Sequence, residues 1–343
     1  MASHIDNALA VGRSLVLSAV ARLPAPAQQA LQTPLVQKTL VVLLVLAVLR
    51  AANRSLSHWV LNNWTRSGPW RPERELVLLT GGCSGIGKQI MLDLARETGV
   101  RIVILDLNEP TFDLPPNVFF YAADVTSPAS IKAAADQIRA AHGDPTILIN
   151  NAGVGYDGTI LDEPEDRIRR TFNVNTMSHF WMVREFLPAM VRRNHGHVVT
   201  IASMASFLAI GEMVDYCCTK ASALAFHEGL TQELRRWYRA PRVRTSVIHP
   251  QWVRTPMVQQ LSDAGSAFRM PIMGPEVVSR AVVRQIVAQR SGQVILPASS
   301  SGLSLLRAAP IWLQEIARNI GSGMIKDVKD REEQLKGALK KGE

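Results

Sequence analysis

Cysteine is scarce in this sequence, with Cys83, Cys217 and Cys218 the only three among 343 residues. So few cysteines exclude a disulfide framework, and their spacing matches no four-ligand zinc pattern. We therefore expect a reducing compartment and no structural metal. Charged residues are also few, at 20%, whereas 47% of the residues are hydrophobic. This balance excludes a mainly disordered chain, and the absence of a repeat period excludes collagen and coiled coils.

Acidic residues are rare at the start of the chain, where basic residues stand beside apolar segments. The whole chain carries a net charge of +9. Basic residues next to apolar stretches favour an anionic membrane surface over a nucleic-acid duplex. No nucleic-acid-binding motif accompanies them. The sequence therefore predicts a membrane partner and no nucleic acid.

A long apolar segment runs from Thr33 to Ala52, with Lys38 and Arg50 near its ends. At 1.5 Å per residue it can cross a hydrocarbon core of about 30 Å. A buried core helix is the alternative, but the basic flanks favour a membrane anchor. A second apolar stretch, Ala8–Leu23, leaves a single span and a hairpin both open. Arginines follow the segment, so the positive-inside rule places the C-terminal portion in the cytosol, with residues 1–74 as anchor and linker.

From Glu75 onward, short apolar runs alternate with helical patterns. We expect strands at 76–79, 101–105, 118–121, 146–149, 197–201 and 244–248, and helices at 86–98, 128–141, 165–193 and 216–238. Fully apolar strands between helices indicate a parallel sheet covered on both faces. The sequence therefore predicts an α/β fold, a doubly wound (Rossmann) sheet over residues 75–296. Residues 297–343 are expected to form a C-terminal extension with a charged tail.

A glycine-rich loop follows the first expected strand, with Gly81, Gly85 and Gly87 in the spacing G-x-x-x-G-x-G. Glycines permit a tight turn and a close backbone approach to a pyrophosphate at a helix N-terminus. Any tight turn can use glycine, so the loop alone is weak evidence. Asp106 ends the second strand, where a carboxylate can accept hydrogen bonds from ribose hydroxyls. A surface turn residue is the alternative for Asp106.

Three polar residues follow one another after the fifth strand: Ser203, Tyr216 and Lys220. Tyr216 and Lys220 are four residues apart, so they share one face of a helix. Alone, the pair is better explained by an ordinary amphipathic helix. Its position after a strand-end serine, in a chain with the glycine loop, favours a catalytic group.

Together these motifs resemble the classical short-chain dehydrogenase/reductase family over about residues 75–296. The family's glycine motif matches Thr80–Gly87, its adenine-side aspartate Asp124, and its Asn-Asn-Ala-Gly motif Asn150–Gly153. Gln251 stands where the family usually has a glycine. The resemblance implies the catalytic residues Asn175, Ser203, Tyr216 and Lys220. It implies an NAD or NADP site formed by Gly81, Ser84, Gly85, Ile86, Gly87, Asp106, Asp124, Val125, Asn151, Ala152, Gly153, Tyr216, Lys220, Val253 and Thr255.

The resemblance also implies a role for each catalytic residue, and none of them requires a metal. Tyr216 would be the general acid/base, although a phenol pKa of about 10 must then fall to about 7. Lys220 and a cationic nicotinamide would favour the phenolate. Ser203 would hydrogen-bond the substrate oxygen, and Asn175 would hold a proton-relay water.

The apolar leader, Asp106 and the C-terminal extension resemble the membrane-bound retinol/17-beta-hydroxysteroid dehydrogenase branch of the family. That likeness implies a lipophilic alcohol or ketone as substrate and a place at the endoplasmic reticulum or lipid droplet, and it allows a homodimer. The apolar residues after Leu296 are expected to wall a pocket, rest on the membrane or cover the core. Two alternatives stay open: an NADP-dependent carbonyl reductase of secondary metabolism or acyl-ketone lipids, and a non-catalytic membrane scaffold.

Cofactor choice is predicted from the residues around Asp106. A 2′-phosphate would oppose its carboxylate, and proteins that accept NADP usually supply a nearby base. Ser84 and Leu107, where such a base often stands in the family, are uncharged. We therefore expect NAD over NADP, with the reach of Lys88 left open.

Overall fold

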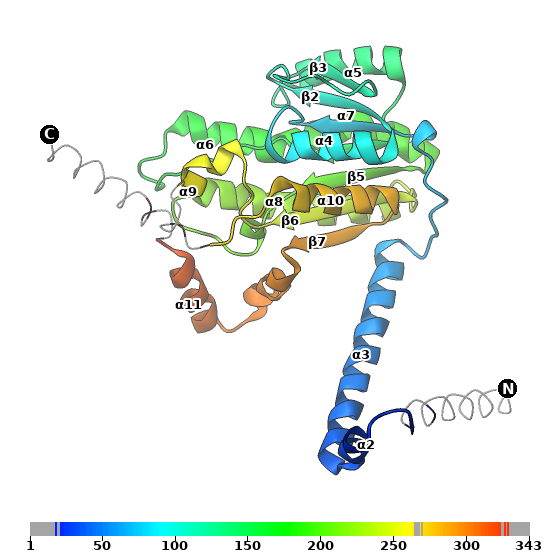
Figure 1. Ribbon diagram of the computed structural model, residues 1–343. Helices are drawn as coiled ribbons and strands as arrows, with labels where there is room; N and C mark the ends of the chain where they lie inside the picture. The colour runs from blue at the N-terminus through cyan, green and yellow to red at the C-terminus, as the bar shows by residue number, and fades with distance from the viewer. Residues whose placement is uncertain are drawn as a thin grey trace, which may run out of the picture. The chain divides into compact units, whose positions relative to one another are not determined.

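Two units make up the computed structural model, Met1–Val60 and Leu61–Glu343 (Figure 1). The structure describes residues 18, 21–263, 268, 270–323, 326 and 328. Most of the apolar stretch Ala8–Leu23 and of the charged tail lies outside the described residues. Each unit is therefore considered by itself.

The N-terminal unit contains α2 (Ala25–Gln32) and most of α3 (Pro34–Leu61). Helix α3 has 28 residues and a mean hydropathy of 2.0 in its most apolar 18-residue window, none of which is buried. Among the described residues it is the one helix long and apolar enough to cross a membrane. The predicted segment Thr33–Ala52 falls within it except for its first residue. Helix α3 continues to Leu61 because no helix-breaking residue interrupts the sequence after Ala52.

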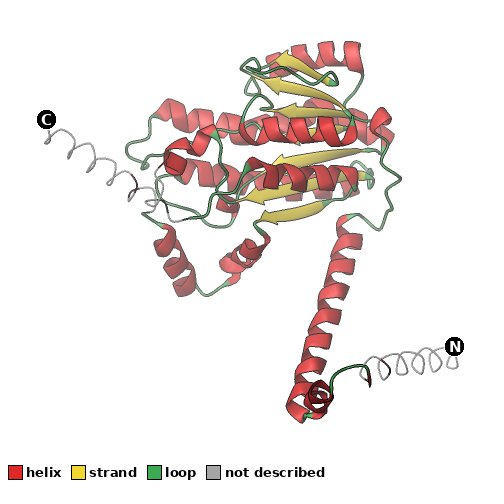
Figure 2. Ribbon diagram, viewed as in Figure 1, coloured by secondary structure: helices red, strands yellow, loops and turns green. Residues whose placement is uncertain are grey.

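The second unit is built on a seven-stranded sheet in the order β3-β2-β1-β4-β5-β6-β7, with every neighbouring pair parallel (Figure 2). The strands are β1 Leu76–Thr80, β2 Arg101–Asp106, β3 Val118–Ala122, β4 Ile147–Asn150, β5 Gly196–Ile201, β6 Val243–Pro250 and β7 Gly292–Leu296. This topology confirms the predicted doubly wound fold. All carboxyl ends of the strands therefore lie at one edge of the sheet.

Helices cover both faces of the sheet, because successive side chains of each buried strand point to opposite sides. Leu76 and Leu78 of β1 belong to the core under the helices of one face, whereas Val77 and Leu79 pack on the other. The first face carries α5 (Pro128–His142), α7 (Ser178–Arg193) and α8 (Val214–Arg236). The second carries α4 (Gly85–Thr98) and α10 (Pro275–Val287).

Two features of the second unit differ from the elements expected. The sheet has a seventh strand, β7, beyond the six that were predicted. Helix α10, which precedes β7, was not predicted either. Strand β7 is an edge strand without a fully buried residue, so it lacks the continuous apolar run that marks the others. The predicted helix 165–193 is divided into α6 (Glu165–Phe172) and α7 by a π-helical turn, Asn173–Met177.

The chain after β7 forms a 3₁₀ segment, Ala298–Ala308, and helix α11 (Ile311–Gly321). None of residues 311–320 is buried. Trp312 is 62% exposed and Ile320 77% exposed. Before this segment, the short helix α9 (Gln259–Asp263) follows a 3₁₀ turn at Pro256–Val258. The C-terminal segment therefore displays apolar side chains instead of burying them.

Residues 62–67, here called the strap, are bound to the starts of the last two strands. The amide oxygen of Asn62 accepts a hydrogen bond from the backbone of Ser291 at 2.9 Å. Arg244 donates to the carbonyl of Asn62 at 2.8 Å, to that of Thr65 at 3.2 Å and to Ser67 Oγ at 3.0 Å. These long-range bonds attach the strap firmly to the sheet.

Candidate active site

A cavity of about 1140 Å³ lies at the carboxyl ends of the strands. This is the position at which parallel α/β sheets bind ligands. It brings together most of the predicted site: Gly81, Ser84, Ile86, Asp106, Asp124, Val125, Asn151, Ala152, Gly153, Ser203, Tyr216, Lys220, Val253 and Thr255. The remaining three predicted residues, Gly85, Gly87 and Asn175, are not among its lining residues.

The glycine loop is braced from the neighbouring strand β4. The Asn151 amide donates to the carbonyls of Thr80 and Gly81, both at 3.0 Å. Gly81 has a φ of +67°, a conformation that favours glycine. A Cβ atom on Gly87 would lie 2.0 Å from the Gly81 carbonyl oxygen. Gly87 is therefore needed to form the turn, even though it does not line the cavity.

Asp106 is held in place by backbone donors at the end of β2. One carboxylate oxygen accepts from the Cys83 backbone at 2.9 Å, and the other accepts from Asn108 at 3.2 Å. Lys88 lies with Nζ 3.8 Å from the centroid of the Phe112 ring, a cation–π contact. The sequence left open whether Lys88 reaches the ribose, and in the structure Lys88 contacts Phe112.

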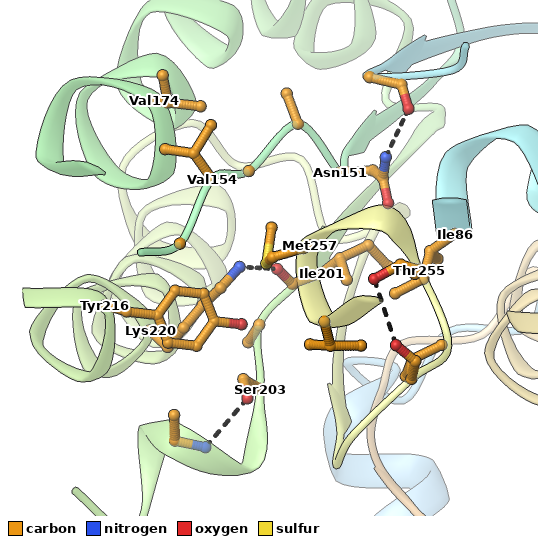
Figure 3. Close-up of a pocket in the computed structure, with 18 of the residues that line it drawn as sticks. Ile86, Asn151, Val154, Val174, Ile201, Ser203, Tyr216, Lys220, Thr255 and Met257 are labelled. Carbon is orange, nitrogen blue, oxygen red and sulfur yellow. Dashed lines mark hydrogen bonds between the residues drawn. The ribbon is translucent and has the colours of Figure 1, made fainter. Parts of the chain in front are cut away.

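Tyr216 and Lys220 meet because both project from one face of α8. Lys220 Nζ lies 5.5 Å from the Tyr216 ring centroid and donates to the Ile201 carbonyl at 2.9 Å. Ser203, just beyond β5, accepts from the Ala205 backbone at 3.1 Å. Figure 3 shows Lys220 passing the Tyr216 ring toward Ile201, with Ser203 near the same ring. The three residues predicted to act on the substrate oxygen thus share one corner of the cavity.

Burial has the largest effect on the pKa values of Tyr216 and Lys220. It raises the pKa of Tyr216 to about 12, although a hydrogen bond with Ser203 acts in the opposite direction. Burial also lowers the pKa of Lys220 to about 8. A shift of the Tyr216 pKa toward 7 is expected from the resemblance, and burial opposes it. The phenol is therefore protonated at neutral pH in this state of the protein.

Asn175 lies in the π-helical turn and is completely buried. Its amide oxygen accepts from the Val154 backbone at 2.8 Å. Its amide nitrogen donates to the Val154 carbonyl at 2.7 Å and to Thr219 Oγ1 at 3.1 Å. The side chain therefore fixes the backbone beside Gly153. The predicted relay water stays a prediction.

His249 is a further residue of the site, placed behind Ser203 at the end of β6. It is fully buried, and its ring lies 4.6 Å from that of Phe207. Nδ1 is 3.0 Å from the Ser203 carbonyl, which can only accept, so Nδ1 carries the proton. Burial lowers the pKa of His249 to about 4, which keeps the ring neutral. The sequence alone does not reveal this bond.

Much of the lining was not identified from the sequence. Among the largely apolar lining residues that it did not name are Tyr156, Leu208, Ile210, Met213, Met257, Val258 and Met270. Ala317 and Ile320 come from α11, and Leu303 from the 3₁₀ segment lines the cavity too. Helix α6 adds the charged residues Asp166, Arg169 and Arg170. The apolar helical spacing of residues 313–320 was the one signal that could have indicated the α11 wall.

The cavity fits a nicotinamide dinucleotide. Gly81 and Ser84 of the glycine loop line it, as do Asp106, which carries a carboxylate, and Tyr216. Its volume slightly exceeds the usual upper size of small-molecule pockets, about 1,000 Å³. Within the described residues, no group of three or more histidine, cysteine, aspartate and glutamate side chains could hold a metal ion.

Comparisons with known proteins agree with this geometry. The short chain dehydrogenase family model matches residues 75–266. Dehydrogenase RED2 of Cochliobolus heterostrophus is 43% identical over 202 residues, which cover 58% of this chain and 76% of that protein. Estradiol 17-beta-dehydrogenase 11 of Macaca fascicularis is 32% identical over 240 residues, covering 68% and 78% respectively.

A solved structure shares the fold. The 3-ketoacyl-(acyl-carrier-protein) reductase of Brucella melitensis, complexed with NADH, superposes with a TM-score of 0.59 at 20% identity. The match covers 66% of this chain and 98% of that one.

Proposed function

Because the chain belongs to the short-chain dehydrogenase family and is therefore an NAD(P)-dependent oxidoreductase, we propose that it oxidises or reduces a lipophilic alcohol or ketone at a membrane. The observation that carries this proposal is the position of Tyr216, Lys220 and Ser203 beside an apolar cavity wall. The substrates implied are retinoids, steroids or other lipid alcohols.

Tyr216 is the proposed acid/base. In reduction its Oη gives a proton to the carbonyl oxygen of the substrate, and in oxidation the phenolate takes the hydroxyl proton. The bound nicotinamide supplies or accepts the hydride. A Tyr216 pKa raised by burial favours proton donation at neutral pH. Oxidation therefore gains rate as the pH rises toward the pKa of Tyr216.

Ser203 and Lys220 hold the reacting groups in place. The Ser203 hydroxyl would hydrogen-bond the substrate oxygen. That hydroxyl accepts a hydrogen bond from the Ala205 backbone, and His249 contacts the Ser203 backbone carbonyl. The Lys220 ammonium would hold the nicotinamide ribose hydroxyls, and its cationic form favours the Tyr216 phenolate. Asn175 holds Val154 and Thr219, the residue that precedes Lys220.

The substrate class is inferred from the walls of the cavity. Leu303, Ala317 and Ile320 of the C-terminal segment line it together with methionines from the α8 and α9 regions. Apolar walls bind a lipid chain by burying its surface, at about 25 cal/mol per Å². The same segment exposes Ile311 and Trp312. Such side chains suit a membrane–water interface, from which a lipid alcohol would enter.

NAD is the proposed cofactor. Asp106 presents its carboxylate beside Cys83 and Asn108, where ribose hydroxyls can donate to it. The 2′-phosphate of NADP would be repelled by this carboxylate. Lys88, the nearby base that could offset the repulsion, already contacts Phe112. Like charges in a partly solvated site cost about 1–3 kcal/mol, or about tenfold to a hundredfold in affinity.

Helix α3 is the proposed anchor, since it is long and apolar enough to cross a membrane once. The arginines that follow it favour a cytosolic catalytic unit by the positive-inside rule. The endoplasmic reticulum or lipid droplet is the corresponding location.

The decisive experiment follows nicotinamide absorbance with the full chain, both cofactors and a panel of alcohols and ketones of increasing chain length. We expect kcat/KM to rise with the apolar surface of the substrate and to be higher with NAD. Equal kcat/KM for short and long substrates would contradict the proposed substrate class. A chain that binds cofactor but turns over no substrate would instead favour the scaffold alternative.

A further inference from the structure

A second pocket, of about 200 Å³, lies at the amino ends of the strands, at the edge of the sheet opposite the candidate active site. Gly196 and Arg244 line it from β5 and β6. Arg66 and Ser67 of the strap line it too, together with Trp70. The pocket is therefore formed partly by the segment that continues from the apolar helix α3.

The walls of this pocket are rich in positive charge. Four arginines line it, Arg66, Arg193, Arg242 and Arg244, against a single carboxylate, Glu75. The carboxylate is already engaged, because Glu75 lies 2.9 Å from His195 Nε2. That contact is the main reason why the pKa of His195 is raised. Of the four arginines, Arg193 contacts a carboxylate outside the pocket, Asp144, at 3.0 Å.

Arg244 is a buried cation with neutral partners. It is 3% exposed, and among the described residues its guanidinium donates to the carbonyls of Asn62, Thr65 and Pro241 and to the hydroxyl of Ser67. Buried charges in proteins are normally paired with an opposite charge. Burial and the nearby Arg242 both lower the pKa of Arg244, and its acceptors supply no opposite charge as compensation. An anion in the pocket would supply that compensation.

Two hydrogen-bond donors at the pocket lack a partner among the described residues. Trp70 Nε1 is buried and makes no hydrogen bond there. The guanidinium of Arg242 also forms no side-chain hydrogen bond or ion pair in the described part of the chain, although its backbone bonds Asn194. An indole N–H left without an acceptor is costly when buried. A phosphate group accepts several such bonds at once, and arginine matches its geometry.

From this arrangement we propose that the pocket binds a phosphate group, held by Arg242, Arg244 and Trp70. The ligand has two sources, the phosphate of an anionic phospholipid and free phosphate in solution. The strap follows α3 directly in the sequence, and for that reason a lipid headgroup is one of the two sources considered. This site is separate from the cavity of Tyr216 and does not depend on the proposed catalysis.

The test measures the thermal stability of the full chain reconstituted in phosphatidylcholine vesicles. Inorganic phosphate is titrated in one arm, and phosphatidic acid is included in the bilayer in the other. Bound ligand raises Tm because it stabilises the folded state alone. Arg242→Gln removes the exposed cation and Trp70→Phe removes the indole donor without losing the ring. Arg280→Gln, an exposed arginine that lines neither pocket, is the matched control.

We expect the wild type and Arg280→Gln to gain stability, and Arg242→Gln to bind at least about tenfold more weakly, as the loss of a charged hydrogen bond predicts. Trp70→Phe should bind several-fold more weakly. A response to phosphatidic acid alone assigns the site to a lipid headgroup, and a response in both arms assigns it to phosphate in general. No response in either arm, or equal responses in all four proteins, would overturn the proposal.

Discussion

At the scale of single residues, Tyr216 carries the clearest prediction. Tyr216→Phe should lower kcat by at least about 10²-fold while leaving cofactor affinity nearly unchanged, because only the proton-transfer group is lost. Steady-state rates and NADH fluorescence titration measure the two effects. Tyr238→Phe, at a half-exposed tyrosine that bonds Glu233, serves as the control and should change neither. Retention of most of the rate in Tyr216→Phe would remove it from the proposed role.

The cofactor preference depends on Asp106 and Leu107. Asp106→Ser combined with Leu107→Arg should shift kcat/KM toward NADP by about tenfold to a hundredfold, because a like charge is replaced by an opposite one. The ratio of kcat/KM for the two cofactors is the measurement. Lys88→Ala is the companion variant, and it should leave the ratio unchanged because Lys88 contacts Phe112. A wild-type enzyme that prefers NADP would contradict the assignment to Asp106.

Residues fixed by local spacing were predictable from the sequence. Tyr216 and Lys220 lie together because they are four residues apart on one helix. Ser203 lies near them because it follows β5 at the carboxyl edge of the parallel sheet. His249 and Ile320 illustrate what was not predictable. The bond from His249 to the Ser203 carbonyl depends on the pairing of β5 with β6. The apolar spacing of residues 313–320 indicates a helix with an apolar face, but it does not indicate that Ile320 lines the cavity.

At the scale of elements, the strands buried on both faces were predictable because each forms an apolar run. Strand β7 escaped prediction because, as an edge strand, it has no fully buried residue and begins with Gly292 and the exposed Gln293. The π-helical turn at Asn173–Met177 escaped prediction for a different reason. One extra residue in a turn leaves the apolar periodicity on both sides nearly unchanged. The turn nevertheless matters, because it carries Asn175 to Val154.

Removal of α3 is the test at the same scale. A chain lacking residues 1–60 should leave membranes and stay folded, because the strap and all its partners in β6 and β7 remain. Sedimentation with washed membranes and circular dichroism are the measurements. If the shortened chain still sediments, α11 becomes the second anchor. Substituting its exposed Trp312 and Ile316 with glutamate should then release the chain.

At the scale of the whole molecule, buried histidines make stability depend on acid. Burial lowers the pKa of His179 and His197 to about 3, and that of His249 to about 4. The unfolded chain, with histidine pKa values near 6.5, binds more protons below that pH. Stability is therefore fully present above about pH 6.5 and is lost as the pH falls toward 4. Each histidine contributes up to about 1.4 kcal/mol per pH unit.

Urea denaturation between pH 7 and 5 measures this loss. His179→Phe is the informative variant, because Nδ1 of His179 has no partner among the described residues. The variant should reduce the dependence of the unfolding free energy on pH by the contribution of one histidine. An unchanged slope would show that His179 is not neutral in the folded protein.

The strap also sets the order in which this protein can be completed during synthesis. Its partners Arg244 and Ser291 leave the ribosome long after Asn62 does. At about 5–20 residues per second, the interval between Asn62 and Ser291 lasts roughly 10–50 s. During that time α3 is already available to a membrane, while Ser291, one partner of the strap, has not yet been synthesised. The apolar helix can therefore insert before the catalytic unit closes, and the last two strands secure the connection only at the end.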